Sequence, residues 1–135
     1  MIELKEDILL ENEEIKRLYD DAQWTAYTND MQKLIRAIQQ SLKVVTAWHN
    51  NTLVGLIRAV GDGETILYIQ DILVLKEYQR YGIGSQLMRQ MLSSYENVRQ
   101  KVLLTEEAKK VRAFYEKHGF NSCDKGTLVS FAKMD

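Results

Sequence analysis

Three strand-like segments follow one another with only short turns between them, and this run constrains the fold more than any other feature of the chain. Val44–Trp48, Leu53–Val60 and Thr65–Leu75 are rich in branched and aromatic residues. The turns His49-Asn50-Asn51 and Gly61-Asp62-Gly63 separate them, and both consist of residues suited to hairpin geometry. The sequence therefore predicts a core of three hairpin-connected antiparallel strands.

Helices and one further strand are predicted before this run. Residues 2–10 read as a first strand. Asn12 is expected to cap a helix that ends near Tyr19, and Asn29 or Asp30 a second helix. Residues 20–28, between the two helices, are expected to form a turn.

After the hairpins the pattern changes to strand–helix crossovers. An amphipathic helix begins near Ile83, Val102–Leu104 is a short strand, and a last helix runs from about Glu106 to a terminal Gly119. Residues from Phe120 onward, including 128–132, are expected to supply the closing strand or strands. The fold class is mixed α/β (α+β) with a mostly antiparallel central sheet and about four helices, in the order β-α-α-β-β-β-α-β-α-β, as a single domain over residues 1–135.

Composition excludes several classes of protein. The chain has 135 residues, 45% of them hydrophobic, which suits one globular domain, and it contains no apolar run long enough to span a membrane. A net charge of −1 argues against general nucleic-acid binding. One cysteine, Cys123, and two histidines make a disulfide or a Cys/His metal site unexpected, and favour a reducing cytoplasm.

Gly82-Ile83-Gly84 lies where a strand gives way to a helix. Glycines leave backbone N–H groups accessible and a helix N-terminus is positive, so this loop suits a phosphate. Leu87 replaces the third glycine of the dinucleotide fingerprint, and no P-loop is present. A lone G-x-G pair is more often structural. Residues 76–112 carry a net charge of +4, which favours an anionic ligand but also fits ordinary solvated helix faces.

Two motifs in this half of the chain resemble those of the GNAT superfamily of N-acetyltransferases. Gln79, Gly82 and Gly84 match the family's acetyl-CoA motif, Q/R-x-x-G-x-G/A after an apolar strand. Downstream, residues 113–120 (AFYEKHGF) resemble its second CoA-contacting segment, F-Y-x-x-x-G-F. The sequence departs from the family where Lys76 replaces a frequent proline and Ala108 a frequent asparagine. The second change leaves the cofactor motif one contact short.

The resemblance implies acetyl-CoA as the acetyl donor, with no metal. It places the pantetheine arm beside the strand that ends at Leu75, with backbone N–H groups near Leu73 polarising the thioester. It also places the pyrophosphate on the backbone of residues 80–85. The cofactor-binding residues it implies are Leu73, Val74, Leu75, Gln79, Arg80, Tyr81, Gly82, Ile83, Gly84, Ser85 and Phe114.

The catalytic groups are less fully specified. Tyr115 is expected to protonate the leaving thiolate, although it could instead pack as core beside Phe114. Polyamine-type relatives carry glutamate at the Gln70 position, followed by aspartate; here only Asp71 is a carboxylate. Strand alternation puts Gln70 and Asp71 on opposite faces unless a bulge intervenes. Asp71 is thus a candidate base or a buried structural acid, and Gln70 could hold a water that takes the proton.

The acceptor site is expected near Trp24, Tyr27 and Tyr68, where aromatic faces, with Asp20 and Asp21 nearby, would suit an amine; Trp24 could instead be core. The predicted function is acetyl transfer to the primary amine of a small molecule: a polyamine, an arylalkylamine or an amino acid derivative. The alternatives are acetylation of a protein lysine or N-terminus, and an idle acyl-CoA-binding module. The resemblance also implies a homodimer paired through residues 128–131, with no nucleic-acid or membrane partner.

Overall fold

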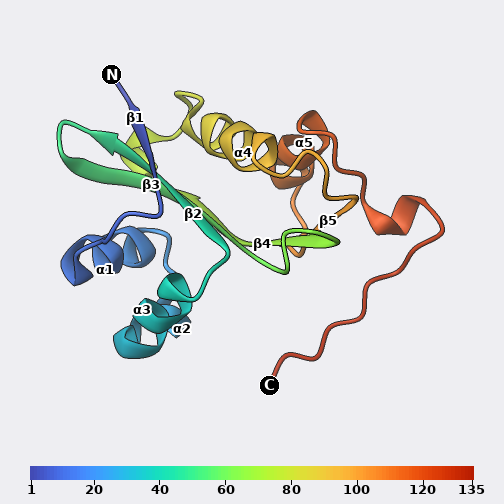
Figure 1. Cartoon of the computed structure of the whole chain (residues 1–135), viewed down its shortest axis with the longest axis horizontal. Coiled ribbons are helices and arrows are strands. Elements are labelled where there is room, and N and C mark those ends of the chain that lie inside the picture. Colours follow the sequence, from blue (N-terminus) through green and yellow to red (C-terminus); the bar gives the residue numbers. More distant parts are fainter. The chain divides into compact units, whose positions relative to one another are not determined.

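The three predicted hairpin strands form the centre of a five-stranded sheet, which the computed structural model shows together with all other residues of the chain, 1–135 (Figure 1). The sheet order is β1-β2-β3-β4-β5; β1 to β4 are antiparallel, and β5 runs parallel to β4. The predicted fold class is therefore confirmed. The strands are β1 (Glu3–Glu6), β2 (Lys43–His49), β3 (Thr52–Val60), β4 (Ile66–Val74) and β5 (Gln100–Leu103).

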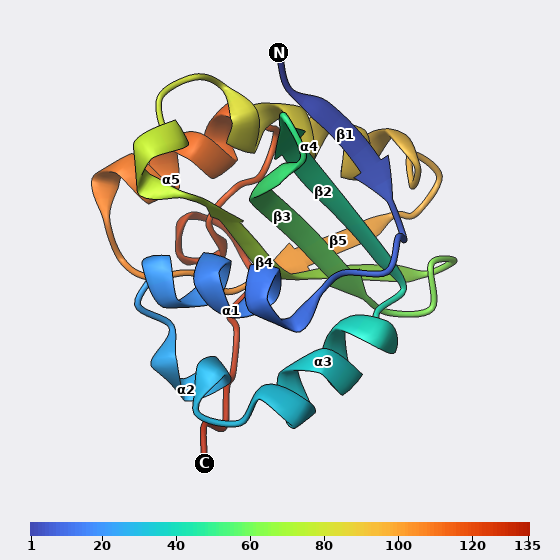
Figure 2. The ribbon, with the colours of Figure 1, turned by 90° about the vertical axis from the view of Figure 1, so that its left-hand side faces the viewer.

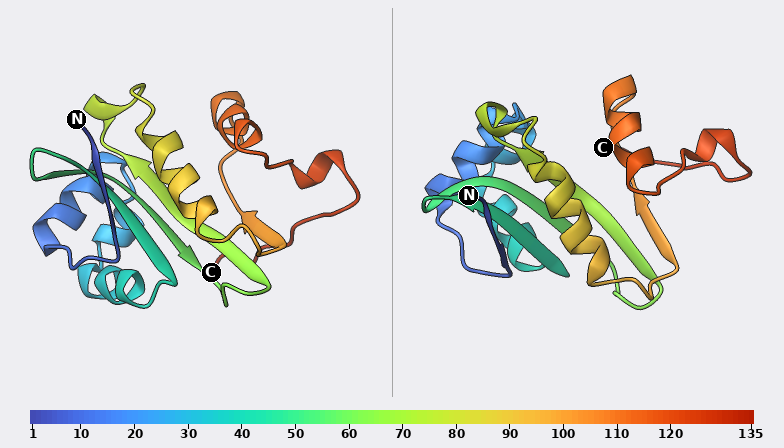
Figure 3. Two further views of the ribbon diagram at one scale, coloured as in Figure 1. Left: turned by 45° about the horizontal axis from the view of Figure 1, so that its top comes forward. Right: turned by 90° about the horizontal axis from the view of Figure 1, so that it is seen from above.

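Helices cover both faces of this sheet (Figures 1 and 2). On one face α1 contacts β3 and β4, and it also packs on α2 and α3; on the other, α4 contacts β2, β3 and β4. Figure 3 shows α4 lying along the sheet. The helices are α1 (Asn12–Asp21), α2 (Thr25–Thr28), α3 (Met31–Gln39) and α4 (Ile83–Ser93).

The apolar side of α4 makes the core on its face. Leu87, Met88 and Met91 are fully buried, as the i, i+4 spacing predicts. Close packing on β3 depends on Gly55, because a Cβ there would lie 3.2 Å from the Leu87 Cδ1 atom. The strand–loop–helix segment is therefore held in place by side chains as well as by the backbone.

The chain divides into two compact units, Met1–Leu104, which holds the sheet, and Thr105–Asp135. The second unit contains α5 (Lys109–Lys117), which ends as predicted at a left-handed Gly119 with φ +91°. The Phe120 N–H donates to the Tyr115 carbonyl at 3.0 Å, closing the helix end. The single-domain assignment stays a prediction.

The predicted closing strand is wrong. After α5 the chain forms one 3₁₀ turn (Cys123–Lys125) and then no regular structure. Residues of the apolar run remain open to solvent, with Leu128 at 69% and Phe131 at 91% exposed. The β-type sequence finds no strand to pair with in this structure, and pairing, not propensity, makes a strand.

The N-terminal segments also differ from prediction. The first strand stops at Glu6, because Asp7 turns to φ +52° and its side chain accepts the Val44 N–H at 2.9 Å. The predicted turn over residues 20–28 instead contains the end of α1 and the short helix α2. Asp30 caps α3 as expected, accepting the Lys33 N–H.

Candidate active site

A β-bulge in β4 shapes the candidate site. Arg58 of β3 pairs with Asp71, but the next residue, Ala59, pairs with Ile69, so Gln70 has no partner on β3. The bulge breaks the strict alternation of β4. As a result Gln70 and Asp71 reach the same side chain, Tyr27, whereas uninterrupted alternation would have placed them on opposite faces.

Asp71 is the centre of a buried hydrogen-bond cluster. It is 2% exposed, and its Oδ2 accepts from the Arg58 Nε at 2.7 Å and from the Tyr19 hydroxyl at 2.9 Å. Its Oδ1 accepts from the Tyr27 hydroxyl at 2.7 Å. The Tyr27 oxygen in turn accepts from Gln70 Nε2 at 3.1 Å and from Arg58 Nη2 at 3.4 Å. The Asp71 carboxylate is therefore engaged within the chain, by an ion pair with Arg58 and by hydrogen bonds from two tyrosine hydroxyls.

Burial and charge fix the protonation of these groups. Burial, with the neighbouring Asp71 carboxylate, raises the pKa of Tyr19. Burial also raises the pKa of Tyr27, against the opposing effect of the Gln70 donor. Burial alone would lower the pKa of Arg58, but the charge of Asp71 and its hydrogen bond hold that pKa above its usual value. At neutral pH both tyrosines are protonated and Arg58 is cationic.

Aromatic side chains from α1 and α2 surround this cluster. The Tyr27 ring lies 5.2 Å from Tyr19 and 6.2 Å from Trp24, centroid to centroid, and Trp24 is 37% exposed. The structure thus brings together Trp24 and Tyr27, which the sequence predicts to bind substrate, and Gln70, which it predicts to be catalytic. Tyr68 pairs with Val60 on the far side of the bulge from Asp71 and is partly buried.

The two aspartates that precede Trp24 already have partners. Asp20 forms an ion pair with Lys16 at 2.7 Å. Asp21 accepts the Lys76 backbone N–H at 2.8 Å. Together with Asp71, each carboxylate expected near the acceptor is therefore engaged within the chain.

One edge of β4 is open beyond the bulge. The last pair with β5 is Ile69 with Leu103, so residues 70–74 have no strand on that side. The Leu75 N–H points to β3, where it donates to the Val54 carbonyl at 2.9 Å. Because N–H directions alternate along a strand, those of Ile72 and Val74 point to the open edge. The sequence predicts that backbone N–H groups near Leu73 polarise the thioester. The N–H groups that point to the open edge there belong to its two neighbours, Ile72 and Val74.

The loop after β4 leads into the N-terminus of α4. Gln79 Nε2 donates to the Val74 carbonyl at 3.1 Å, tying the loop to the strand end. Arg80 and Gly82 both have left-handed backbones, with φ +73° and +80°. The first helical bond runs from Gln86 N–H to the Gly82 carbonyl, so the N–H groups of Ile83 and Gly84 precede the helical ladder. This donor set fits a pyrophosphate.

The second unit holds the other predicted residues, Phe114 and Tyr115. Both are partly buried, with ring centroids 5.2 Å apart. Burial raises the pKa of Tyr115, against a hydrogen bond with the Thr105 side chain that lowers it. Tyr115 is therefore protonated at neutral pH, as a proton donor must be.

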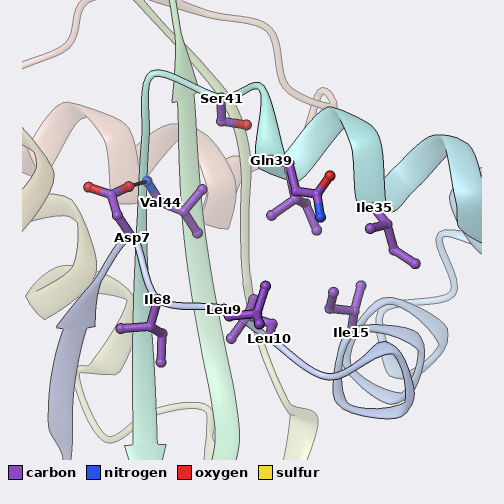
Figure 4. A pocket seen from close by; sticks show the side chains of 10 residues that line it. Asp7, Ile8, Leu9, Leu10, Ile15, Ile35, Gln39, Ser41 and Val44 are labelled. Atoms are coloured by element: carbon purple, nitrogen blue, oxygen red, sulfur yellow. Dashed lines mark hydrogen bonds between the residues drawn. The ribbon is translucent and has the colours of Figure 1, made fainter.

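A cavity of about 290 Å³ lies elsewhere in the first unit, between the β1–α1 segment and α3 (Figure 4). Its wall is mostly aliphatic, and none of the predicted site residues lines it. It offers little polar chemistry for acetyl transfer. The lining residues are Asp7, Ile8, Leu9, Leu10, Ile15, Ile35, Ile38, Gln39, Ser41 and Val44.

Comparison with known proteins decides the family. The sequence model of the family described as "Acetyltransferase (GNAT) domain" matches residues 7–131, which is nearly the whole chain. The chain belongs to the GNAT family of acetyltransferases. Acetyl transfer from acetyl-CoA is the chemistry of this family, and this GNAT chain is accordingly an N-acetyltransferase, as the two sequence motifs predict.

Individual relatives agree with the family assignment. A GNAT-family acetyltransferase of Streptococcus pneumoniae is 33% identical, with a TM-score of 0.89 over 100% of this chain and 98% of that one. An uncharacterized, ycf52-like N-acetyltransferase of Prochlorococcus marinus is 26% identical over 87% of this chain and 67% of its own length. An aminoglycoside N-acetyltransferase in complex with CoA has a TM-score of 0.73, covering 99% of this chain and 95% of its own; at 15% identity it shows the shared fold.

No helix of the chain combines the length and apolar character needed to cross a membrane. No group of three or more His, Cys, Asp or Glu side chains is arranged to hold a metal ion.

Sequence reasoning did not identify Tyr19 and Arg58 as part of the site. A signal for Arg58 existed, because it is the only charged residue in the apolar strand 52–60 and faces Asp71, the only charged residue in 66–74. Two lone opposite charges in adjacent strands indicate a buried pair. Tyr19 had no such signal, since an aromatic residue late in a helix is ordinarily core.

Proposed function

We propose that this GNAT enzyme acetylates the primary amine of a small molecule that carries an aromatic or other flat apolar group. The observation that carries the proposal is the Trp24–Tyr27 aromatic surface beside exposed Gln70, at the start of the open β4 edge. An aromatic surface next to the reacting strand would orient a ring and leave its amine at the thioester.

The engaged carboxylates favour this class over polyamines. A polycation needs unpaired negative charge, but Asp20, Asp21 and Asp71 each have a partner within the chain. The groups that remain to contact a substrate are the aromatic faces of Trp24 and Tyr27 and the side-chain amide of Gln70. Among the three small amines considered from the sequence, the arylalkylamine is therefore the best supported.

We propose that the open edge and the following loop hold acetyl-CoA. The outward N–H groups of Ile72 and Val74 would polarise the thioester carbonyl, and the loop Gln79–Ser85 would hold the pyrophosphate. Tyr115 would then donate its proton to the thiolate. Support comes from the donor directions in β4 and from the left-handed backbones at Arg80 and Gly82.

A panel of amines tests the proposed function. Thiol release from acetyl-CoA is measured with arylalkylamines, polyamines, amino acid amides and a lysine peptide, at one concentration and one pH. We expect the highest kcat/KM with an arylalkylamine. A preference for the peptide or the polyamine contradicts the proposed class, and no release with any acceptor supports the idle acyl-CoA-binding module.

We also propose that a second copy of the chain covers the C-terminal segment. Leu128, Val129, Phe131 and Met134 are each more than two-thirds exposed, and β5 is the last strand of the sheet, with one free edge. Exposed apolar residues and a free strand edge both favour association. Light scattering at micromolar concentration is expected to give the mass of a dimer, and a monomeric mass would contradict this.

A cytoplasmic location stays a prediction.

A further inference from the structure

We propose that the side-chain carbonyl of Gln70 accepts a hydrogen bond from the attacking amine and so positions it, and that Tyr27, Asp71 and Arg58 are positioning residues that fix the direction of this amide. The inference rests on the proposed function, because it names the group that holds the acceptor of that same reaction. It assigns a catalytic part to a side chain that cannot itself take a proton.

The direction of the amide follows from a chain of donors and acceptors that begins at Arg58. An arginine only donates, and Asp71, ion-paired with it, only accepts. The Tyr27 hydroxyl gives its single proton to Asp71 Oδ1 at 2.7 Å, so its oxygen can only accept from other groups. Gln70 must therefore turn its NH₂ group to Tyr27, at 3.1 Å.

The consequence is an oriented acceptor on an exposed residue. With its NH₂ group held by Tyr27, Gln70 presents Oε1 away from the cluster, and no hydrogen bond to Oε1 is present in the structure. Gln70 is exposed and lies two residues before Ile72, whose N–H points to the open edge of β4. The residue that offers an acceptor to the amine and the residue that offers a donor to the thioester are thus two apart on one strand, with a rise of about 7 Å between their Cα atoms.

This arrangement suits attack by a neutral amine. One N–H donates to Gln70 Oε1 while the nitrogen lone pair attacks the acetyl carbon. The N–C bond forms, the C–S bond breaks, the thiolate takes the proton of Tyr115, and the proton lost by nitrogen replaces it there. The reaction balances as neutral amine plus thioester giving amide plus thiol. No carboxylate base is needed, which agrees with the engagement of Asp71 by three donors.

The neighbouring titratable groups do not supply a base either. Tyr19 from α1, Tyr27 from α2, Arg58 from β3 and Asp71 from β4 all belong to the cluster and use their protons or lone pairs within it. Tyr68 pairs with Val60, on the far side of the bulge from Asp71. The supply of neutral amine should therefore control the pH dependence.

The first test uses benzylamine and 4-nitrobenzylamine, whose amine is less basic, as acceptors. For the wild-type enzyme the midpoint of the kcat/KM profile should follow the basicity of the amine and lie lower for the nitro compound. For Gln70→Glu, which introduces a carboxylate, activity should extend to lower pH with both. A wild-type midpoint that is the same for both amines would mean that an enzyme group is the base and would overturn the proposal.

The second test separates positioning from structure. Gln70→Met should lower kcat about 10- to 100-fold with the acetyl-CoA KM unchanged, whereas the control Gln100→Met, another exposed glutamine on the sheet, should have no effect. Tyr27→Phe should lower kcat about tenfold in the wild-type background but less than twofold in Gln70→Glu, because a carboxylate accepts at both oxygens and needs no orientation. An equal loss in both backgrounds would make Tyr27 merely structural.

A third measurement does not need activity. The side-chain ¹⁵N–H signals of Gln70 should shift in Tyr27→Phe, since the NH₂ group loses its acceptor, while those of Gln100 should not. If these signals do not move, the proposed orientation is wrong. If they move but neither amine nor water releases thiol from acetyl-CoA, the proposed function fails and the Gln70 assignment fails with it.

Discussion

Breaking the buried ion pair between Arg58 and Asp71 should destabilise the first unit strongly. Their side chains are 5% and 1% exposed, and Nε lies 2.7 Å from Oδ2. Asp71→Asn keeps the shape but leaves the guanidinium buried without its counter-charge. Arg58→Met leaves the carboxylate with only the two tyrosine donors. Removing one partner of a buried pair typically costs about 3–5 kcal/mol.

Urea unfolding followed by tryptophan fluorescence measures this loss. Trp24 and Trp48 are the only tryptophans, and both lie in the first unit. With an m-value of about 2 kcal/mol/M, the midpoint should fall by about 1.5–2.5 M for either variant, at unchanged m. Lys16→Met is the matched control, because the Lys16–Asp20 pair has the same 2.7 Å length on the surface and should leave the midpoint nearly unchanged.

The double variant decides between a coupled pair and two separate effects. In Arg58→Met/Asp71→Asn no buried charge remains, so its cost should be smaller than the sum of the single costs by about 2–3 kcal/mol. Additivity within about 0.5 kcal/mol would refute the reasoning, as would single costs no larger than that of the surface control.

Three further perturbations have defined outcomes. The raised pKa of Tyr19 means that its stabilisation is complete below about pH 10, where free tyrosine ionises, and is lost above it. The share of Tyr19 in the unfolding free energy should fall there by about 1.4 kcal/mol per pH unit. Tyr19→Phe should therefore make the alkaline slope shallower by that amount, and an unchanged slope would contradict this. The Cβ of Gly82→Ala would meet no atom within 4 Å, so the left-handed backbone alone should be strained, by about 1–2 kcal/mol, and calorimetry should show about tenfold weaker CoA binding. Gly63→Ala, in a distant turn, should lose stability only. Equal CoA affinities of the wild type and Gly82→Ala would count against this loop as the CoA site. Tyr115→Phe should lower kcat by about 10- to 1000-fold with CoA affinity retained, and full activity would return Tyr115 to a packing role.

Local patterns were enough to predict much of the scaffold. The hairpin run, the amphipathic stripe of α4 and the glycine that ends α5 each depend on neighbours within a few residues, and all three were confirmed. The prediction of a closing strand was wrong because a strand depends on a partner that is not local in the sequence. Residues 128–132 have strand-like composition, but a strand also needs an edge to pair with, and the structure gives this segment none.

The sequence by itself determined the family and located the loop that we propose for the pyrophosphate, because Gly82 and Gly84 act through backbone geometry that is local to one turn. Only the tertiary structure decided the surroundings of Gln70 and Asp71, where we propose that the acceptor binds. Tyr19 and Tyr27 reach Asp71 from 52 and 44 residues away. The bulge that aligns Gln70 with them is a property of the register between β3 and β4, and no single strand encodes it. Asp71 could be read from sequence as a base or as a buried acid; its ion pair with Arg58, set by that register, supports the second reading.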